Sequence, residues 1–168
     1  MLLLSLLATL GAGWLLAPTP ALVLTDDRTG AVLAWLPADG PVTMRYVHSL
    51  VRQPAAEVFA VEPAGLRLVR LVSPSEAVLE YYARVEPIRP LGDAFVIEVV
   101  GEAARPLTAL ASALGRRSVE SGGRAVVLHE VAPHGTPIRL TIETPTAGRL
   151  LCWQADRAVG NVGLDLVE

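Results

Sequence analysis

The sequence has little of the material from which metal and redox sites are built. It contains one cysteine, Cys152, and three histidines in 168 residues. A single cysteine cannot form an intramolecular disulfide, and no cysteine–histidine cluster has the spacing of a zinc site. We therefore expect neither a metal ion nor another cofactor, and we interpret Cys152, which lies among large apolar residues, as a small buried hydrophobic side chain.

Lysine is absent, so all 14 basic residues are arginines, and 17 acidic residues give a net charge of −3. The arginines are scattered along the chain and form no basic cluster. A nucleic-acid-binding protein needs a concentrated positive surface. The charge pattern therefore excludes a nucleic-acid partner.

The common sequence motifs of enzymes are also missing. The chain has no G-x-S-x-G motif, no glycine-rich phosphate loop, no H-E-x-x-H motif and no EF-hand loop. The pair Gly122-Gly123 lies between two β-like runs and predicts a hairpin turn, not a nucleotide-binding loop. His129 and His134 supply too few ligands for a metal site. We therefore expect that the protein is not an enzyme.

The N-terminal segment is apolar, and no charged side chain precedes Asp26. Its dense apolar part, residues 2–16, fits the hydrophobic core of a signal peptide better than a membrane span of about 20 residues. Pro18 and Pro20 end this run just before a small-residue cleavage site at Ala21. We predict that residues 1–21 are a signal peptide or, if uncleaved, an inner-membrane anchor formed by residues 2–17. The alternative is a buried helix of a cytosolic protein.

Residues 22–168 show the pattern of a single β-rich domain. The apolar N-terminal segment places this domain, as an expectation, in the periplasm or elsewhere outside the cytoplasm. Short apolar or alternating runs are separated by glycine, proline and aspartate at the spacing typical of a β-sandwich or barrel. One helix is expected at residues 106–114, where Pro106 suits the first turn and leucines recur at helical spacing. The fold class is thus mainly β, an antiparallel sandwich or barrel-like meander. The expected strands are 22–25, 31–36, 42–48, 56–62, 66–72, 77–85, 94–99, 124–131, 138–143 and 150–153.

The stretch RYVHSLVRQPAAEVF, residues 45–59, contains two polar residues in phase with apolar ones. His48 shares the face of Tyr46, and Glu57 shares the face of Phe59, if both runs are strands. In an antiparallel hairpin with a loop at residues 50–55, one register places His48 opposite Glu57. A slip of two residues places Tyr46 opposite Glu57 instead, and either register keeps both polar groups on the apolar face.

Ser49 follows His48, but neighbours in a strand point to opposite faces. A serine–histidine pair of the hydrolase type is therefore not expected. A mutually satisfied His48–Glu57 pair that stabilises the turn is one interpretation. A contact with a ligand or a partner at the rim of the sheet is the other.

The segment MRYVHSLVRQPAAEVFAVEPAGLRLVR resembles the signature of a bacterial domain of unknown function, number eighteen-fifty in the domain catalogues. The residues that match its pattern are His48, Ser49, Pro54 and Glu57. The resemblance covers about residues 22–143. The family's glycine-rich segment is replaced here by SPSEAVLEYYARV, which has no glycine.

This resemblance implies a small exported protein, often encoded beside TRAP transporters of the TAXI class. The expected function is that of a non-enzymatic accessory or binding protein, whose partner is a TAXI-class permease or its substrate-binding protein. The alternative is a small hydrolase or metal-dependent enzyme that uses His48 and Glu57, with Arg45 or Arg52 orienting an anionic substrate.

Overall fold

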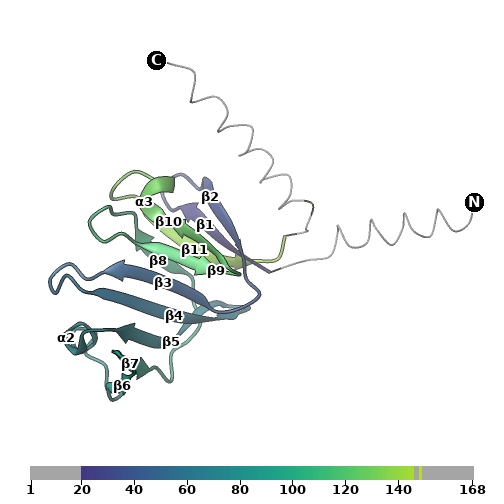
Figure 1. Ribbon diagram of the computed structural model, residues 1–168. Helices are drawn as coiled ribbons and strands as arrows, with labels where there is room; N and C mark the ends of the chain where they lie inside the picture. Colours follow the sequence, from purple (N-terminus) through teal and green to yellow (C-terminus); the bar gives the residue numbers. More distant parts are fainter. Residues whose placement is uncertain (1–19, 146–147, 149–168) are drawn as a thin grey trace, which may run out of the picture. The chain divides into compact units, whose positions relative to one another are not determined.

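A computed structural model describes residues 20–145 and 148 of the chain. Residues Ala21–Glu143 form a compact unit in which eleven strands and two short helices are found (Figure 1). Their bounds are β1 (Ala21–Asp26), β2 (Val32–Pro37), β3 (Val42–Val47), β4 (Pro54–Glu62), β5 (Gly65–Ser73), α2 (Glu76–Glu80), β6 (Arg89–Leu91), β7 (Ala94–Glu98), β8 (Leu107–Leu110), β9 (Ser118–Ser121), β10 (Arg124–Val127), α3 (Leu128–Val131) and β11 (Pro137–Glu143).

Some predictions fall outside the described residues. These are the apolar leader with its N-terminal helix, the strand at residues 150–153, the burial of Cys152 and the extension of the domain from 146 to 168, apart from residue 148. Within the part that the structure describes, no helix is long and apolar enough to cross a membrane.

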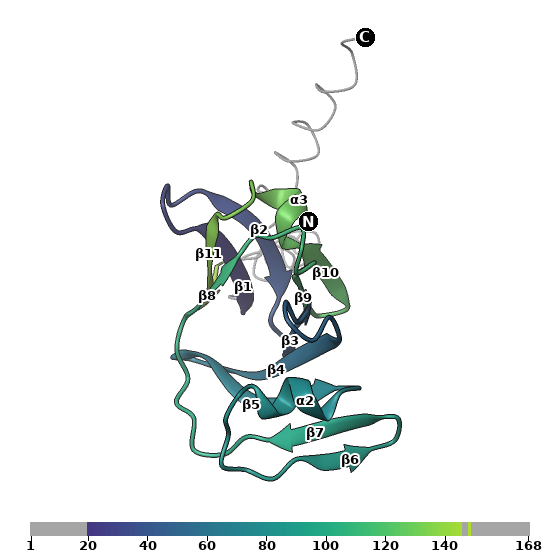
Figure 2. The same cartoon turned by 90° about the vertical axis from the view of Figure 1, so that its left-hand side faces the viewer.

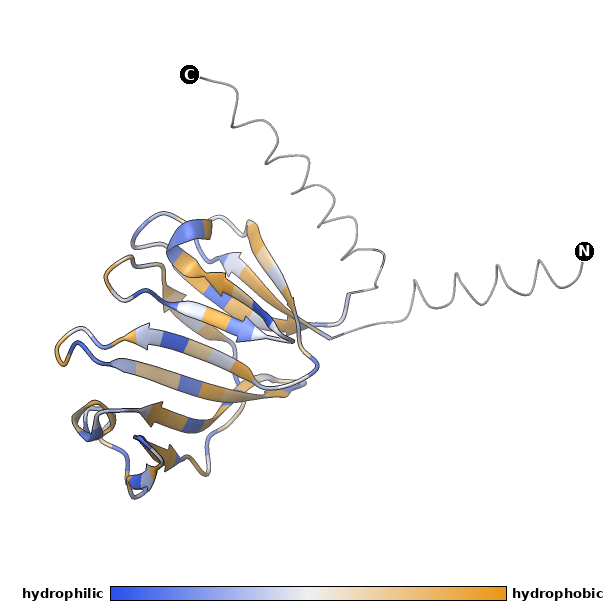
Figure 3. Cartoon of the chain, in the orientation of Figure 1, coloured by the Kyte–Doolittle hydropathy of each residue, from blue (hydrophilic) through white to orange (hydrophobic). Residues whose placement is uncertain are grey.

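The strands form two antiparallel sheets, which confirms the prediction of a mainly β chain. The four-stranded sheet has the order β2-β1-β11-β8, and the seven-stranded sheet has the order β10-β9-β3-β4-β5-β7-β6 (Figures 1 and 2). Hydrophobic and hydrophilic residues follow one another along many of these strands, as the two faces of a pleated strand require (Figure 3). Strand β1 differs, because its residues Ala21 to Leu24 are all buried.

The two sheets meet where β2 ends beside the β9–β10 hairpin. The buried Ser121 hydroxyl donates a hydrogen bond of 2.6 Å to the carbonyl oxygen of Pro37. Gly122 and Gly123 form the predicted hairpin turn, and both have the positive φ values, 53° and 70°, of its left-handed conformation. A Cβ atom on Gly122 would lie 2.5 Å from Cβ of Pro37, so this contact requires glycine.

The stretch 77–85, predicted as a strand, instead begins with helix α2. Val78 and Leu79 are adjacent and both buried, which a strand exposed on one face would not allow. The helix packs against β5 and β7 (Figure 2), and Leu79 joins Leu71, Ile97 and Val99 in a buried cluster. The strand prediction was wrong because a five-residue helix is too short to show helical periodicity.

The helix predicted at residues 106–114 is a strand and a turn. Leu107–Leu110 forms β8, which pairs with β11, and its burial alternates, with Ala109 buried and Leu110 exposed. The leucines at helical spacing are thus not a core-facing helical surface, since Leu114 is 78% exposed. Pairing with the edge of the four-stranded sheet overrides the local helical preference.

The strand predicted at residues 124–131 ends early, at Val127, and helix α3 follows with Leu128 fully buried. The short strands β6 and β9 were not predicted. Strand β9 nevertheless joins β3 to β10 in the larger sheet.

Candidate ligand-binding site

The predicted hairpin exists, and its turn lies two residues earlier in the chain than expected. Strand β3 ends at Val47 and β4 begins at Pro54, its partner. The His48 amide donates to the Gln53 carbonyl, and the Arg52 amide donates to the His48 carbonyl, both at 2.9 Å. Arg52 takes a left-handed conformation, with φ of 58°, which closes the turn.

The predicted registers of this hairpin were wrong. Glu57 pairs with Met44, and Tyr46 pairs with Ala55 in place of Phe59, a shift of four residues from the first register. The loop was assumed to reach residue 55, but Pro54 is accommodated as the first residue of a strand, where its missing N–H is tolerated. Because the shift is even, Tyr46 and Glu57 still share a face.

His48 therefore does not lie opposite Glu57. It leaves the strand and belongs to the turn together with Ser49, so the argument that they point to opposite faces of a strand does not apply. Both residues line a cavity, and Glu57 lines the same cavity from β4.

This cavity has a volume of about 480 Å³. Its walls come from the β3–β4 hairpin, from the end of α2 and from the segment after β8. All three tyrosines of the chain lie in these walls. The lining residues are Tyr46, Val47, His48, Ser49, Arg52, Glu57, Tyr81, Tyr82, Leu110, Ser112, Leu114, Gly115 and Arg117.

A chain of hydrogen bonds crosses the cavity wall from Tyr46 to Glu57. The Tyr82 hydroxyl donates to Glu57 Oε1 at 2.8 Å and also contacts the Tyr46 hydroxyl. Because the single proton of Tyr82 goes to Glu57, Tyr46 is the donor to Tyr82. Burial raises the pKa of both tyrosines, and the Glu57 carboxylate raises that of Tyr82 further. Both phenols therefore stay protonated and act as donors.

His48 is held by its own turn. Its Nδ1 accepts a hydrogen bond of 3.3 Å from the Val51 amide, and its ring meets the ring of Tyr81 edge-on, with centroids 4.8 Å apart. In a neutral imidazole an acceptor at Nδ1 leaves the proton on Nε2. The group that His48 offers to a ligand is then a donor, not a base.

Two arginines give the cavity positive character. Among the described residues neither Arg52 nor Arg117 has a carboxylate partner, and Arg117 is half-buried. The guanidinium carbon of Arg117 lies 5.5 Å from the centroid of the Tyr46 ring. The Val47 amide donates to the Gly115 carbonyl at 2.8 Å, which fixes the segment that carries Arg117 beside β3.

Two predicted site residues lie away from this cavity. Arg45 forms an ion pair of 2.8 Å with Glu120 on β9, whereas Arg52, the alternative to it for orienting an anionic substrate, lines the cavity. Pro54 accepts a hydrogen bond of 2.8 Å from the Ser73 hydroxyl and starts β4. Both residues line a different hollow of about 330 Å³.

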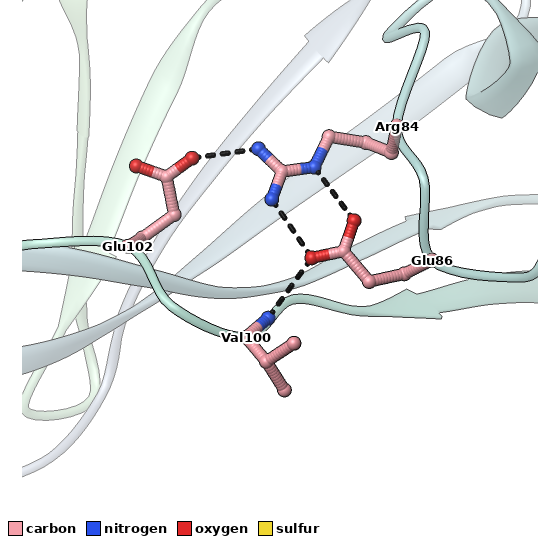
Figure 4. A network of polar contacts seen from close by, with 4 residues as sticks. All are labelled: Arg84, Glu86, Val100 and Glu102. Atoms are coloured by element: carbon pink, nitrogen blue, oxygen red, sulfur yellow. Dashed lines mark hydrogen bonds and ion pairs between the residues drawn. The ribbon is translucent and has the colours of Figure 1, made fainter.

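A network around Arg84 fixes the chain that follows Tyr81 and Tyr82, the two cavity tyrosines directly after α2 (Figure 4). Arg84 donates two hydrogen bonds to Glu86 and one of 2.6 Å to Glu102, and the Val100 amide donates to Glu86 at 3.1 Å. These bonds lower the pKa of Glu86, chiefly through Arg84, to about 2. The network joins the segment after Tyr82 to the segment after β7.

Sequence reasoning missed Tyr81, Tyr82 and Arg117 as site residues. The adjacent pair Tyr81-Tyr82 holds two of the three tyrosines of the chain, and this concentration was the available signal. Among the described residues, no group of three or more histidine, cysteine, aspartate or glutamate side chains could hold a metal ion.

Comparison with known proteins gives no relative: no family model, no curated protein and no solved structure matches the chain. The resemblance of residues 45–59 to the domain of unknown function therefore stays a prediction.

Proposed function

We propose that this protein is a non-enzymatic binding domain, exported from the cytoplasm, that holds a small ligand in the cavity and works with a TAXI-class TRAP transport system. The observation that carries the binding role is the cavity of about 480 Å³ itself. This volume lies in the range of about 300–1,000 Å³ that is usual for small-molecule sites.

The residues His48, Ser49 and Glu57, which support the resemblance to the exported family, all line this cavity. The partnership with a TAXI-class permease or its substrate-binding protein rests on that resemblance. If residues 2–17 stay uncleaved, they tether the domain to the inner membrane beside such a permease.

The alternative function, a small hydrolase or metal-dependent enzyme, is favoured by one observation: His48 and Glu57 line the same cavity. The hydrogen bond of His48 favours the binding role instead. The lone pair of His48 Nδ1 is directed at the Val51 amide. A general base needs a free lone pair beside the reacting proton.

The transport role is tested by affinity purification of the tagged full chain from solubilised membranes of its own host. We expect mass spectrometry to find a TAXI-class permease or substrate-binding protein enriched over an untagged control. Recovery of neither component would contradict the transport role.

A further inference from the structure

The cavity walls combine exposed apolar surface with two arginines that form no ion pair among the residues the structure describes. Leu110 is 50% exposed, Tyr81 is 63% exposed and Leu114 is 78% exposed, and all three line the cavity. Leu50, in the turn beside His48 and Ser49, is 67% exposed. Large apolar side chains gathered around a cavity are typical of a site that an apolar ligand covers.

The charges of the lining favour an anion. Arg52 and Arg117 contribute two positive charges, and Glu57 contributes one negative charge, which leaves one positive charge in excess. The Glu57 carboxylate already accepts a hydrogen bond from the Tyr82 hydroxyl, whereas Arg117 forms no ion pair with a carboxylate in the described part of the chain. A half-buried guanidinium of this kind binds a carboxylate through paired, charge-assisted hydrogen bonds.

Three tyrosines near a carboxylate could also suggest a cage for an organic cation. The position of Arg117 argues against that occupant, because its guanidinium already lies over the ring of Tyr46. A second cation would meet this charge, and an anion would be attracted by it.

Resting on the proposed binding function, we propose that the cavity binds an organic acid with an apolar body. The carboxylate lies against Arg117, with Arg52 at the rim, and the donor Nε2–H of His48 is available to the same group. The apolar body covers Tyr81, Leu110 and Leu114.

The test is isothermal titration calorimetry of the full chain with three probes that share one body: phenylbutyrate, its neutral amide and phenylbutylamine. We expect the acid to bind at least about tenfold more tightly than the amide, because only the acid makes a charge-assisted hydrogen bond. Equal affinity for acid and amide, or preference for the amine, would overturn the proposal.

The variant Arg117→Gln should weaken phenylbutyrate binding by at least about tenfold. The matched control is Arg89→Gln, which removes one positive charge from the exposed edge strand β6 and should leave the affinity unchanged. Equal losses in both variants would show that net charge, not the cavity, attracts the acid.

A second variant, Leu114→Asn, guards against a folding defect, because this side chain is largely exposed. It should weaken phenylbutyrate binding several-fold at an unchanged unfolding temperature, and unchanged affinity would contradict the apolar half of the site.

The ligand class and the transport role can fail separately. If affinity purification recovers a transporter component but phenylbutyrate binding does not respond to Arg117→Gln, the ligand class is wrong and the transport role stands. If the acid binds as expected and no transporter component is recovered, the ligand class stands and the transport role is wrong.

Discussion

The Tyr82 hydroxyl is the central group of the cavity's polar wall, because it donates a hydrogen bond to Glu57 and accepts one from Tyr46. Its neighbour Tyr81 presents its ring to His48 and is mostly exposed. The two residues are adjacent in sequence but have different roles. This difference provides a matched pair of substitutions.

Replacing Tyr82 with Phe should destabilise the protein by about 1–3 kcal/mol, because it leaves the part-buried Glu57 carboxylate without that donor. Tyr81→Phe should change the free energy of unfolding by less than about 0.5 kcal/mol, as is usual for exposed positions. Urea unfolding of the two variants measures both values. Equal values would contradict the hydrogen-bond chain.

The segment between α2 and β6 is held by its ionic network, not by a strand ladder. Arg84, Glu86 and Glu102 connect it to the chain after β7 (Figure 4), and the Glu86 side chain is only 9% exposed. This places the network directly after the two tyrosines of the cavity wall.

The network makes stability depend on pH in a defined window. The pKa of Glu86 is lowered from 4.5 to about 2, so the unfolded chain binds a proton more readily than the folded chain as the pH falls below about 4.5. The stabilisation is therefore fully present above pH 4.5 and is lost as the pH falls towards 2.

Stability curves between pH 6 and pH 2 for the wild type and Glu86→Gln should show a weaker pH dependence in the variant. Glu80→Gln, at an exposed position at the end of α2, serves as the control and should keep the wild-type dependence. Parallel curves for the wild type and Glu86→Gln would contradict this role of the network.

The sequence predicted the β3–β4 hairpin but not the cavity beside it. Strand parity correctly placed Tyr46 and Glu57 on one face, since a period of two survives any even shift of register. The register depended on how the turn closes around Arg52, which no local pattern specifies. Tyr82 and Arg117 reach the cavity through strand pairings far along the chain, and only the topology of the larger sheet brings them to Tyr46.

The two sheets are joined by a contact that only glycine permits. Gly122 approaches Pro37 closely. Gly123 has a similar left-handed φ, but a Cβ atom added to it would meet no other atom within 4 Å. Substitution of Gly123 therefore tests only the backbone conformation of the hairpin, whereas substitution of Gly122 tests this conformation together with the packing of one sheet on the other.

Gly123→Ala should cost about 1–2 kcal/mol, the usual penalty of a left-handed conformation for a residue with a Cβ. Gly122→Ala should cost a further 1–3 kcal/mol or so, because its Cβ overpacks the contact with Pro37. Thermal unfolding of the two variants measures the difference. Equal costs would show that the join between the sheets does not depend on this contact.

The position of the ligand within the whole molecule is tested most directly by an NMR titration of the isotopically labelled full chain with phenylbutyrate. We expect the largest amide shifts at Val51, Tyr82 and Gly115, which come from the three separate segments that form or support the cavity wall. The amides around Arg124, at the β9–β10 hairpin, should stay unchanged. Shifts that centre on that hairpin or spread evenly over both sheets would contradict a binding site in the cavity.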